Sequence, residues 1–201
     1  SIVAGQAYNA ESSGIRAATT SEYANPDVYV MSNGSGVNRY APRAATDSAD
    51  VTSPLTTTEV RTIVEEAFDV MSRARAQIRK PLDSRAQVTI SVVDTHGVIL
   101  AMVRSPDAPI FGSDVSLQKA RTATFFSNSV AGVQLGSVTR SVPIGGGGLD
   151  VNVTARVGEI RTFIGDPNAL TGTHALADRS GGNLARPYFP DGEVGTANGP
   201  L

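Results

Sequence analysis

The chain has 201 residues, of which 40% are hydrophobic and 18% charged, and its formal net charge is -2. This length suits one domain with extensions, and a mixed charge without a basic run argues against binding to nucleic acid or anionic lipid. The absence of cysteine excludes disulfides, thiolate zinc sites and cysteine nucleophiles, and no apolar stretch approaches the ~20 residues that a transmembrane helix needs. Because the chain begins with Ser1 instead of Met, we expect that an export signal has been removed and that the protein is periplasmic or extracellular.

Residues 1–54 have the composition of an extended N-terminal arm. They are rich in Ala, Ser, Thr and Gly, and Asn33–Gly36 reads as a turn. Val28–Met31 is the stretch of this arm that could form a short strand. The arm contains too little apolar material to build a core of its own, so we expect it to lie on another surface.

The first regular element is expected after Pro54. Thr56 and Glu59 have the spacing of a capping box, and apolar residues then recur at the i, i+3, i+4 and i+7 positions of one helical stripe. The members of this stripe are Val60, Ile63, Val64, Ala67, Val70, Met71, Ala74 and Ile78. The pattern predicts a helix over residues 57–79, ended by Pro81.

A β-hairpin is expected next. Residues 87–94 are rich in β-branched side chains, and residues 98–104 form an apolar returning strand. Asp94, Thr95, His96 and Gly97 between them have turn chemistry, and Gly97 can adopt positive φ. Pro106 and Pro109 then predict a stiff bend, which leads into a helix over residues 114–126 that Ser113 or Asp114 could cap.

The bend carries the best polar constellation of the sequence, Arg104, Asp107, Lys119 and Arg121. These side chains could hold an anion such as a haem propionate or a small carboxylate, and unpaired amides at the helix N-terminus near Ser113 would favour the same anion. Under the alternative interpretation, Asp107 pairs with Arg104 and the constellation only fixes the bend.

The C-terminal third gives weaker signals. Val151, Val153 and residues 160–164 suggest short strands, and the four-glycine run at residues 145–148 reads as a loop. Residues 166–201 are dominated by Pro, Gly and Asn, and we interpret them as an irregular C-terminal arm.

His96 and His174 are the two histidines and thus the imidazole candidates for a metal ion or a haem iron. Both also suit exposed loop positions, and no His–x–x–x–His motif or carboxylate cluster supports a metal site. Met31, Met71 and Met102 could be soft haem ligands, but Met71 and Met102 lie on faces predicted to be core. No G–x–S–x–G motif and no marked pair of carboxylates occurs, so no catalytic residue is identified and the sequence favours binding over catalysis.

Four features in order resemble the GlcG/HbpS family of haem-binding or haem-degrading-like domains. They are the helix TTTEVRTIVEEAFDVMSRARA, the hairpin VVD–x–x–G, the bend R–x–x–D–A and the helix S–x–x–K–A–R–T–A, which together cover residues 55–129. The resemblance implies an α+β fold, an antiparallel sheet flanked by helices in profilin-like or PAS-like layering. It also implies haem as a possible cofactor and a homo-oligomeric assembly.

The chain departs from that family towards its end. The closing strands of the family, with their G–A–I–G–V–S–G motif, are not found, so we expect that the chain is a fragment or that a second chain completes the sheet. We divide the chain into an N-terminal arm (1–54), a GlcG/HbpS-like domain (55–165) and a C-terminal arm (166–201). Two functions stay open: an exported, oligomeric module that binds haem or a small ligand, and a non-catalytic structural or accessory subunit of a larger assembly.

Overall fold

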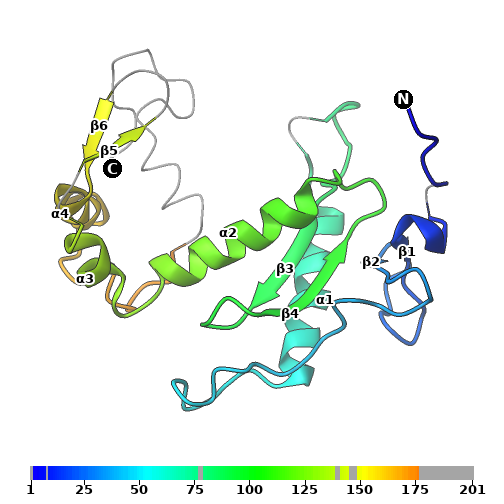
Figure 1. The fold of residues 1–201 in the computed structure, drawn as a ribbon, viewed down its shortest axis with the longest axis horizontal. Helices are drawn as coiled ribbons and strands as arrows, with labels where there is room; N and C mark the ends of the chain where they lie inside the picture. Colours follow the sequence, from blue (N-terminus) through cyan, green and yellow to red (C-terminus); the bar gives the residue numbers. More distant parts are fainter. Residues whose placement is uncertain (1, 8, 77–78, 139–140, 145–148, 177–201) are drawn as a thin grey trace. The chain divides into compact units, whose positions relative to one another are not determined.

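The structure is a computed structural model that describes most of the chain. The described residues are 2–7, 9–76, 79–138, 141–144 and 149–176, so the four-glycine run and most of the predicted C-terminal arm lie outside them. The chain divides into two compact units, Ser1–Ala120 and Arg121–Leu201 (Figure 1). No helix within the described residues is long and apolar enough to cross a membrane.

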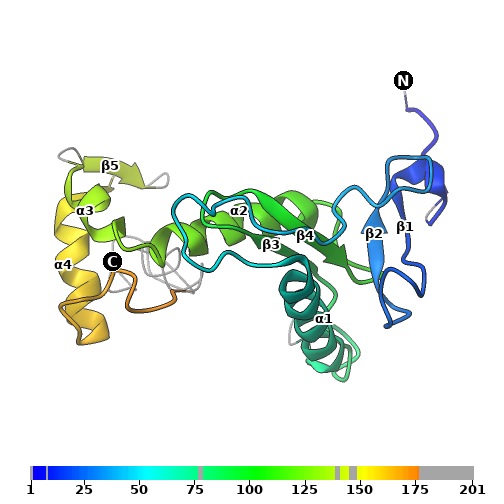
Figure 2. The same ribbon diagram turned by 90° about the horizontal axis from the view of Figure 1, so that it is seen from below.

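The first unit is built on a four-stranded antiparallel sheet, which confirms the α+β class. Its strand order is β1-β2-β4-β3, and helix α1 packs against β3 and β4 (Figure 2). The elements are the 3-10 turn η1 (Glu11–Ser13), strands β1 (Ile15–Ala17) and β2 (Tyr29–Met31), helix α1 (Thr57–Arg73), and strands β3 (Thr89–Val93) and β4 (Ile99–Arg104).

Helix α1 begins as the sequence predicts and ends earlier. The Thr56 hydroxyl accepts a hydrogen bond from the Glu59 amide, and the Glu59 carboxylate accepts one from the Thr56 amide, so the capping box is confirmed. The predicted end near residue 79 is wrong, because Ala74 turns extended. The chain after it pairs with a later segment instead: the Ala76 amide donates to the Ser84 carbonyl and the Ala86 amide to the Ala74 carbonyl. That pairing replaces the helical hydrogen bonds of a further turn.

The buried face of α1 is narrower than the predicted stripe. Val60, Val64, Phe68 and Met71 are buried and form the core with residues of β2 and β4. Phe68 was not in the predicted stripe, and Ile63 and Val70 of that stripe are exposed.

The predicted hairpin is confirmed. Strands β3 and β4 are antiparallel, and Gly97 has φ 73° in the turn between them. The Asp94 carboxylate accepts hydrogen bonds from the His96 and Val98 amides, which closes the turn. A register shift between Val92 and Val93 marks a bulge beside it.

The N-terminal segment packs on its own chain, which corrects the expectation of a foreign surface for its apolar residues. Strand β2 pairs with β1 and with the end of β4, so the predicted strand is confirmed. Val28 is 1% exposed and Val30 0% exposed, and both lie in the core that α1 covers. The strand that β2 joins, β4, comes much later in the chain, so the segment alone does not reveal the surface that covers it.

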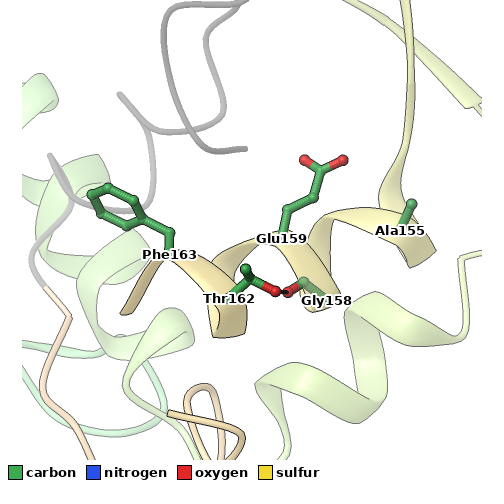
Figure 3. A pocket seen from close by; sticks show the side chains of 5 residues that line it. All are labelled: Ala155, Gly158, Glu159, Thr162 and Phe163. Carbon is green, nitrogen blue, oxygen red and sulfur yellow. Dashed lines mark hydrogen bonds between the residues drawn. The ribbon is translucent and has the colours of Figure 1, made fainter. Parts of the chain in front are cut away.

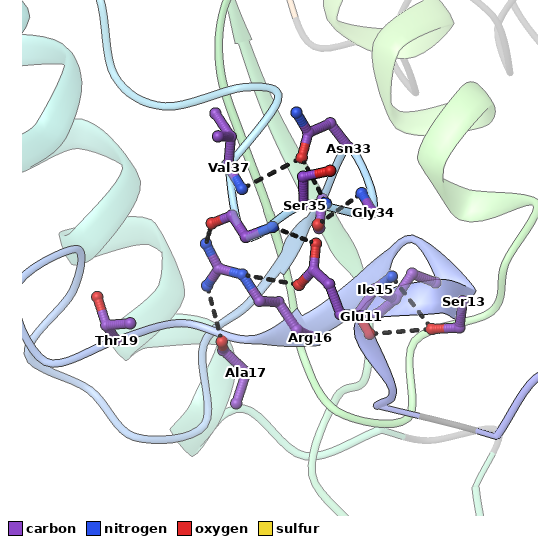
Figure 4. A network of polar contacts seen from close by, with 12 residues as sticks. Glu11, Ser13, Ile15, Arg16, Ala17, Thr19, Asn33, Gly34, Ser35 and Val37 are labelled. Carbon is purple, nitrogen blue, oxygen red and sulfur yellow. Dashed lines mark hydrogen bonds and ion pairs between the residues drawn. The ribbon is translucent and has the colours of Figure 1, made fainter.

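Arg16 of β1 fastens this segment through a polar network (Figure 4). Its guanidinium bonds both Glu22 oxygens at 2.8 and 2.9 Å, lies 3.4 Å from the Glu11 carboxylate, and donates to the Gly36 carbonyl at 2.8 Å. The hydrogen bond from Arg16 lowers the pKa of Glu22 to about 2. The Arg16 side chain therefore ties strand β1 to the parts of the segment that carry Glu11, Glu22 and Gly36.

The second unit contains α3 (Ala131–Gly136), β5 (Ser141–Ile144), β6 (Leu149–Asn152) and α4 (Val153–Ile164). Helix α2 (Gly112–Phe126) begins in the first unit and ends in the second. The strands suggested at residues 153 and 160–164 are wrong, because this segment is α4. The Asn152 side chain caps it by accepting from the Ala155 amide, and Gly165 ends it at φ 76°. A core of Ala131, Val157, Ile160, Ala169 and Leu170 holds the unit together.

Candidate functional site

The two faces of the β3–β4 hairpin differ in chemistry. Side chains alternate along a strand, so Ile90 and Val103 face the apolar core beneath α1. Thr89 and Ser91 point to the opposite face, together with Arg104, which is paired with Thr89. One face of the hairpin is therefore apolar and the other carries polar side chains.

Helix α2 approaches the polar face through its first two turns. The Ser91 and Ser116 hydroxyls are 2.6 Å apart, and a Cβ added to Gly112 would lie 3.4 Å from the Thr89 hydroxyl oxygen. The layer between α2 and the sheet is thus polar at this end, an unusual composition for a helix–sheet contact.

A row of three residues crosses the sheet at this layer. Arg104 is paired with Thr89 on one side and with Tyr29 of β2 on the other. Directly paired residues have side chains on the same face, so the hydroxyl, the guanidinium and the phenol ring line up across three strands.

Arg104 is the central member of this row and is 1% exposed. Its Nη2 donates to the Ala108 carbonyl of the bend. Its Nε and Nη1 are buried and have no hydrogen-bond partner among the described residues, and the same holds for Thr89 Oγ1. Buried charges in proteins are normally paired, so the site holds a cation whose hydrogen-bonding capacity is largely unused.

Asp107 does not supply the missing counter-charge. Its carboxylate lies 3.6 Å from Arg79 Nη1, and its side chain is 85% exposed. Its amide donates to the Gln87 side chain at 3.1 Å. The alternative in which Asp107 pairs with Arg104 is therefore wrong, although Arg104 does hold the bend through Ala108.

The helix N-terminus also differs from the expectation. Helix α2 starts at Gly112, and the Gly112 and Ser113 amides donate to the Pro109 and Ile110 carbonyls at 3.0 and 3.1 Å. The unpaired amides expected near Ser113 are thus taken up by the bend. Lys119 and Arg121 are exposed on α2, and Lys119 lies roughly 10 Å along the helix from Gly112 at ~1.5 Å per residue.

The two histidines lie apart from Arg104. His96 Nε2 is 2.7 Å from the Asp50 carboxylate in the hairpin turn, at the opposite end of β4 from Arg104. At ~3.3 Å per residue, Ile99 and Arg104 alone are separated by about 16 Å. His174 belongs to the second unit, where its Nε2 is 2.5 Å from the Asp166 carboxylate and lowers the pKa of Asp166.

Carboxylates at the hairpin turn have structural partners. The Thr46 amide and hydroxyl donate to Asp94, and the Thr95 amide and hydroxyl donate to Asp47. Burial raises the pKa of Asp94, but these hydrogen bonds outweigh it and the net pKa is lowered. The described residues contain no group of three or more His, Cys, Asp or Glu side chains that could hold a metal ion.

A shallow hollow lies on α4 of the second unit (Figure 3). The described residues that line it all come from this helix: Ala155, Gly158, Glu159, Thr162 and Phe163. Glu159 is its charged member and already pairs with Arg156. Because no set of polar groups converges on the hollow, we favour the Arg104 layer as the candidate site.

Sequence reasoning selected Arg104 but missed Thr89, Tyr29 and Gly112. Thr89 could have been found, because an antiparallel hairpin that turns at residues 94–98 places it close to Arg104. Tyr29 comes from a distant segment, and no local signal indicates that it joins the row.

Comparison with known families supports the assignment made from the motifs. Residues 64–160 match the family model described as haem degrading protein HbpS-like. The match runs from within α1 to within α4 and includes Thr89, Arg104 and Gly112. No curated protein and no solved structure matched the chain. Residues 64–160 are therefore similar to the HbpS-like family, which is haem-related.

Proposed function

We propose that the first unit binds a largely apolar ligand that carries a carboxylate, with haem as the candidate from the family, and that Arg104 receives the carboxylate. The observation that carries this proposal is the buried guanidinium, whose Nε and Nη1 have no hydrogen-bond partner among the described residues. A buried charge left unpaired is costly, and an anionic ligand group would relieve that cost.

Apolar side chains beside the bend suit the rest of such a ligand. Ile110 is 63% exposed and Phe111 70% exposed, and both follow closely on Ala108. Exposed apolar groups around a charged anchor are typical of sites for amphipathic ligands.

The residues at this site suit the propionate groups of haem better than they suit the iron, which needs an axial ligand. Arg104 and Thr89 could hold a propionate, whereas His96 is too far along the hairpin to reach the same porphyrin. Bound haem would bring redox-active iron to the protein, and the chain's own contribution at this site is to anchor the carboxylate and cover the ring with apolar side chains.

Spectrophotometric titration of the purified chain with hemin tests the proposal. A charge-assisted hydrogen bond contributes about 1.5–3 kcal/mol, so Arg104→Met should weaken hemin binding roughly 10- to 150-fold. Arg39→Met is the matched control, because Arg39 is exposed and its guanidinium lies over the Tyr40 ring. Equal affinity of the two variants would remove Arg104 from the site.

A second candidate, a subunit of a larger assembly, is favoured by the outer face of α1. Ile63 and Val70 are exposed there on either side of Ala67, at helical spacing. We propose that the exported protein forms homo-oligomers that cover this stripe. Light scattering after size exclusion should then give more than the 20.8 kDa of one chain, and Val70→Glu should reduce it to that value. A wild-type chain that runs as a monomer would contradict this candidate.

A further inference from the structure

The Thr89 hydroxyl is a second buried polar group that the fold leaves unused. Thr89 is 9% exposed, and its Oγ1 has no hydrogen-bond partner among the described residues. A buried hydroxyl without a partner is destabilising, and a Val of nearly the same shape would avoid that cost. Retaining a hydroxyl here is understandable if it bonds something that enters the layer.

Thr89 and Arg104 are arranged to meet one group. They are directly paired across β3 and β4, so their side chains leave the same face of the sheet side by side. Gly112 stands over the Thr89 hydroxyl, where a Cβ would lie 3.4 Å from Oγ1. Because residue 112 has no side chain, no Cβ stands in contact with this hydroxyl.

We infer that Thr89 and Gly112 complete the Arg104 niche as a receptor for a free carboxylate, so that the ligand is recognised by its acid group and not by a metal. This inference rests on the proposed function and names the chemical class that the site selects. One carboxylate oxygen accepts from the guanidinium, and the other accepts from the Thr89 hydroxyl.

The donor set favours a carboxylate over a phosphate. A phosphate at a helix N-terminus is normally held by several backbone amides, but the Gly112 and Ser113 amides already donate to the bend. Among the described residues of this layer, the Arg104 guanidinium and the Thr89 hydroxyl are the donors without a full set of partners, and they match a planar acceptor with two oxygens.

The same residues explain why a metal would not be needed. Arg104 cannot donate a lone pair to a metal ion, because it remains protonated and has no acceptor atom. Neither Thr89 nor Gly112 brings an imidazole, a thiolate or a carboxylate. Iron-free porphyrins that keep their acid groups should therefore bind as hemin does.

The test compares protoporphyrin IX with its dimethyl ester, with binding to the full chain followed by porphyrin fluorescence. The free acid should bind at least about tenfold more tightly than the ester, the factor expected from one hydrogen bond to a charged group. Thr89→Val should remove about tenfold for the acid and leave the ester unchanged. The Thr62→Val variant is the matched control, because Thr62 is exposed on α1.

Gly112→Ala gives an independent measurement. Gly112 does not need positive φ and the added Cβ makes ordinary contact, so the variant should fold and melt no lower than the wild type. Its methyl group fills the space above the Thr89 hydroxyl, so it should weaken binding of the acid.

Equal affinity for acid and ester, or a Thr89→Val effect of the same size on both, would overturn the inference while leaving Arg104-dependent hemin binding intact. If neither hemin nor protoporphyrin IX binds in a manner that depends on Arg104, the inference and the proposed function both fail.

Discussion

The replacement Arg104→Met should affect stability and binding in opposite directions. In the ligand-free protein the guanidinium is buried and makes one hydrogen bond to the Ala108 carbonyl, and its Nε and Nη1 have no partner within the part of the chain that the structure describes. Met has a similar length and no polar group to bury. The variant therefore loses one useful contact and removes two buried donors and a charge.

The magnitudes favour a net gain in stability. Losing the hydrogen bond from a charged donor costs about 1.5–3 kcal/mol, whereas each buried unsatisfied polar group costs about 1–3 kcal/mol, and more when it is charged. Replacing buried ionic groups with apolar ones of similar volume is often neutral or stabilising by about 1–4 kcal/mol. We expect the variant to unfold at an equal or higher urea concentration than the wild type, with weaker hemin binding.

Urea unfolding followed by circular dichroism, with and without hemin, is the assay. Hemin should stabilise the wild type and have little effect on the variant, since a ligand stabilises only the state that it binds. A ligand-free variant that loses about 2 kcal/mol or more, together with unchanged hemin affinity, would show that Arg104 serves the bend alone.

Three further predictions concern parts of the first unit around the site. Gly97→Val should cost on the order of 1–2 kcal/mol, because Gly97 has φ 73°; an unchanged melting temperature would count against this turn. The pKa of Glu22 falls from 4.5 to about 2 on folding, so the protein should lose stability as pH falls from about 4.5 to 2. Urea unfolding of Glu22→Gln should show a weaker dependence on pH over this range. Identical pH profiles of the variant and the wild type would refute the role of Arg16. Asp107→Ala should change stability by less than about 1 kcal/mol, because the pair with Arg79 is exposed, and should leave hemin affinity unchanged; a large loss of affinity would return Asp107 to the site.

Local signals in the sequence were sufficient for the helix start, the hairpin and β2. A capping box, alternating β-branched residues and a turn glycine are each decided by neighbours in the chain, so their consequences could be predicted. The end of α1 depends on pairing with residues 84–86. The segment after Asn152 is helical although its residues are typical of strands. The end of α1 and the helical state of this segment are therefore both decided by the tertiary structure.

In the candidate site too, some features follow from neighbouring residues in the sequence and others only from the tertiary structure. Arg104 stands out in the sequence because it ends an apolar strand before a bend with two prolines. Three features of the site result from packing: the guanidinium is buried, Asp107 turns to Arg79, and the Gly112 and Ser113 amides donate to the bend. A single sequence does not reveal which donors remain free after the chain has closed around them.

A crystal structure of the chain with protoporphyrin IX is the most direct test of the central claim. The account predicts that one ligand carboxylate lies within about 3 Å of an Arg104 guanidinium nitrogen and of Thr89 Oγ1, with the ring against Ile110 and Phe111. A ligand bound at His96 or in the α4 hollow, with Arg104 still unpaired, would contradict it.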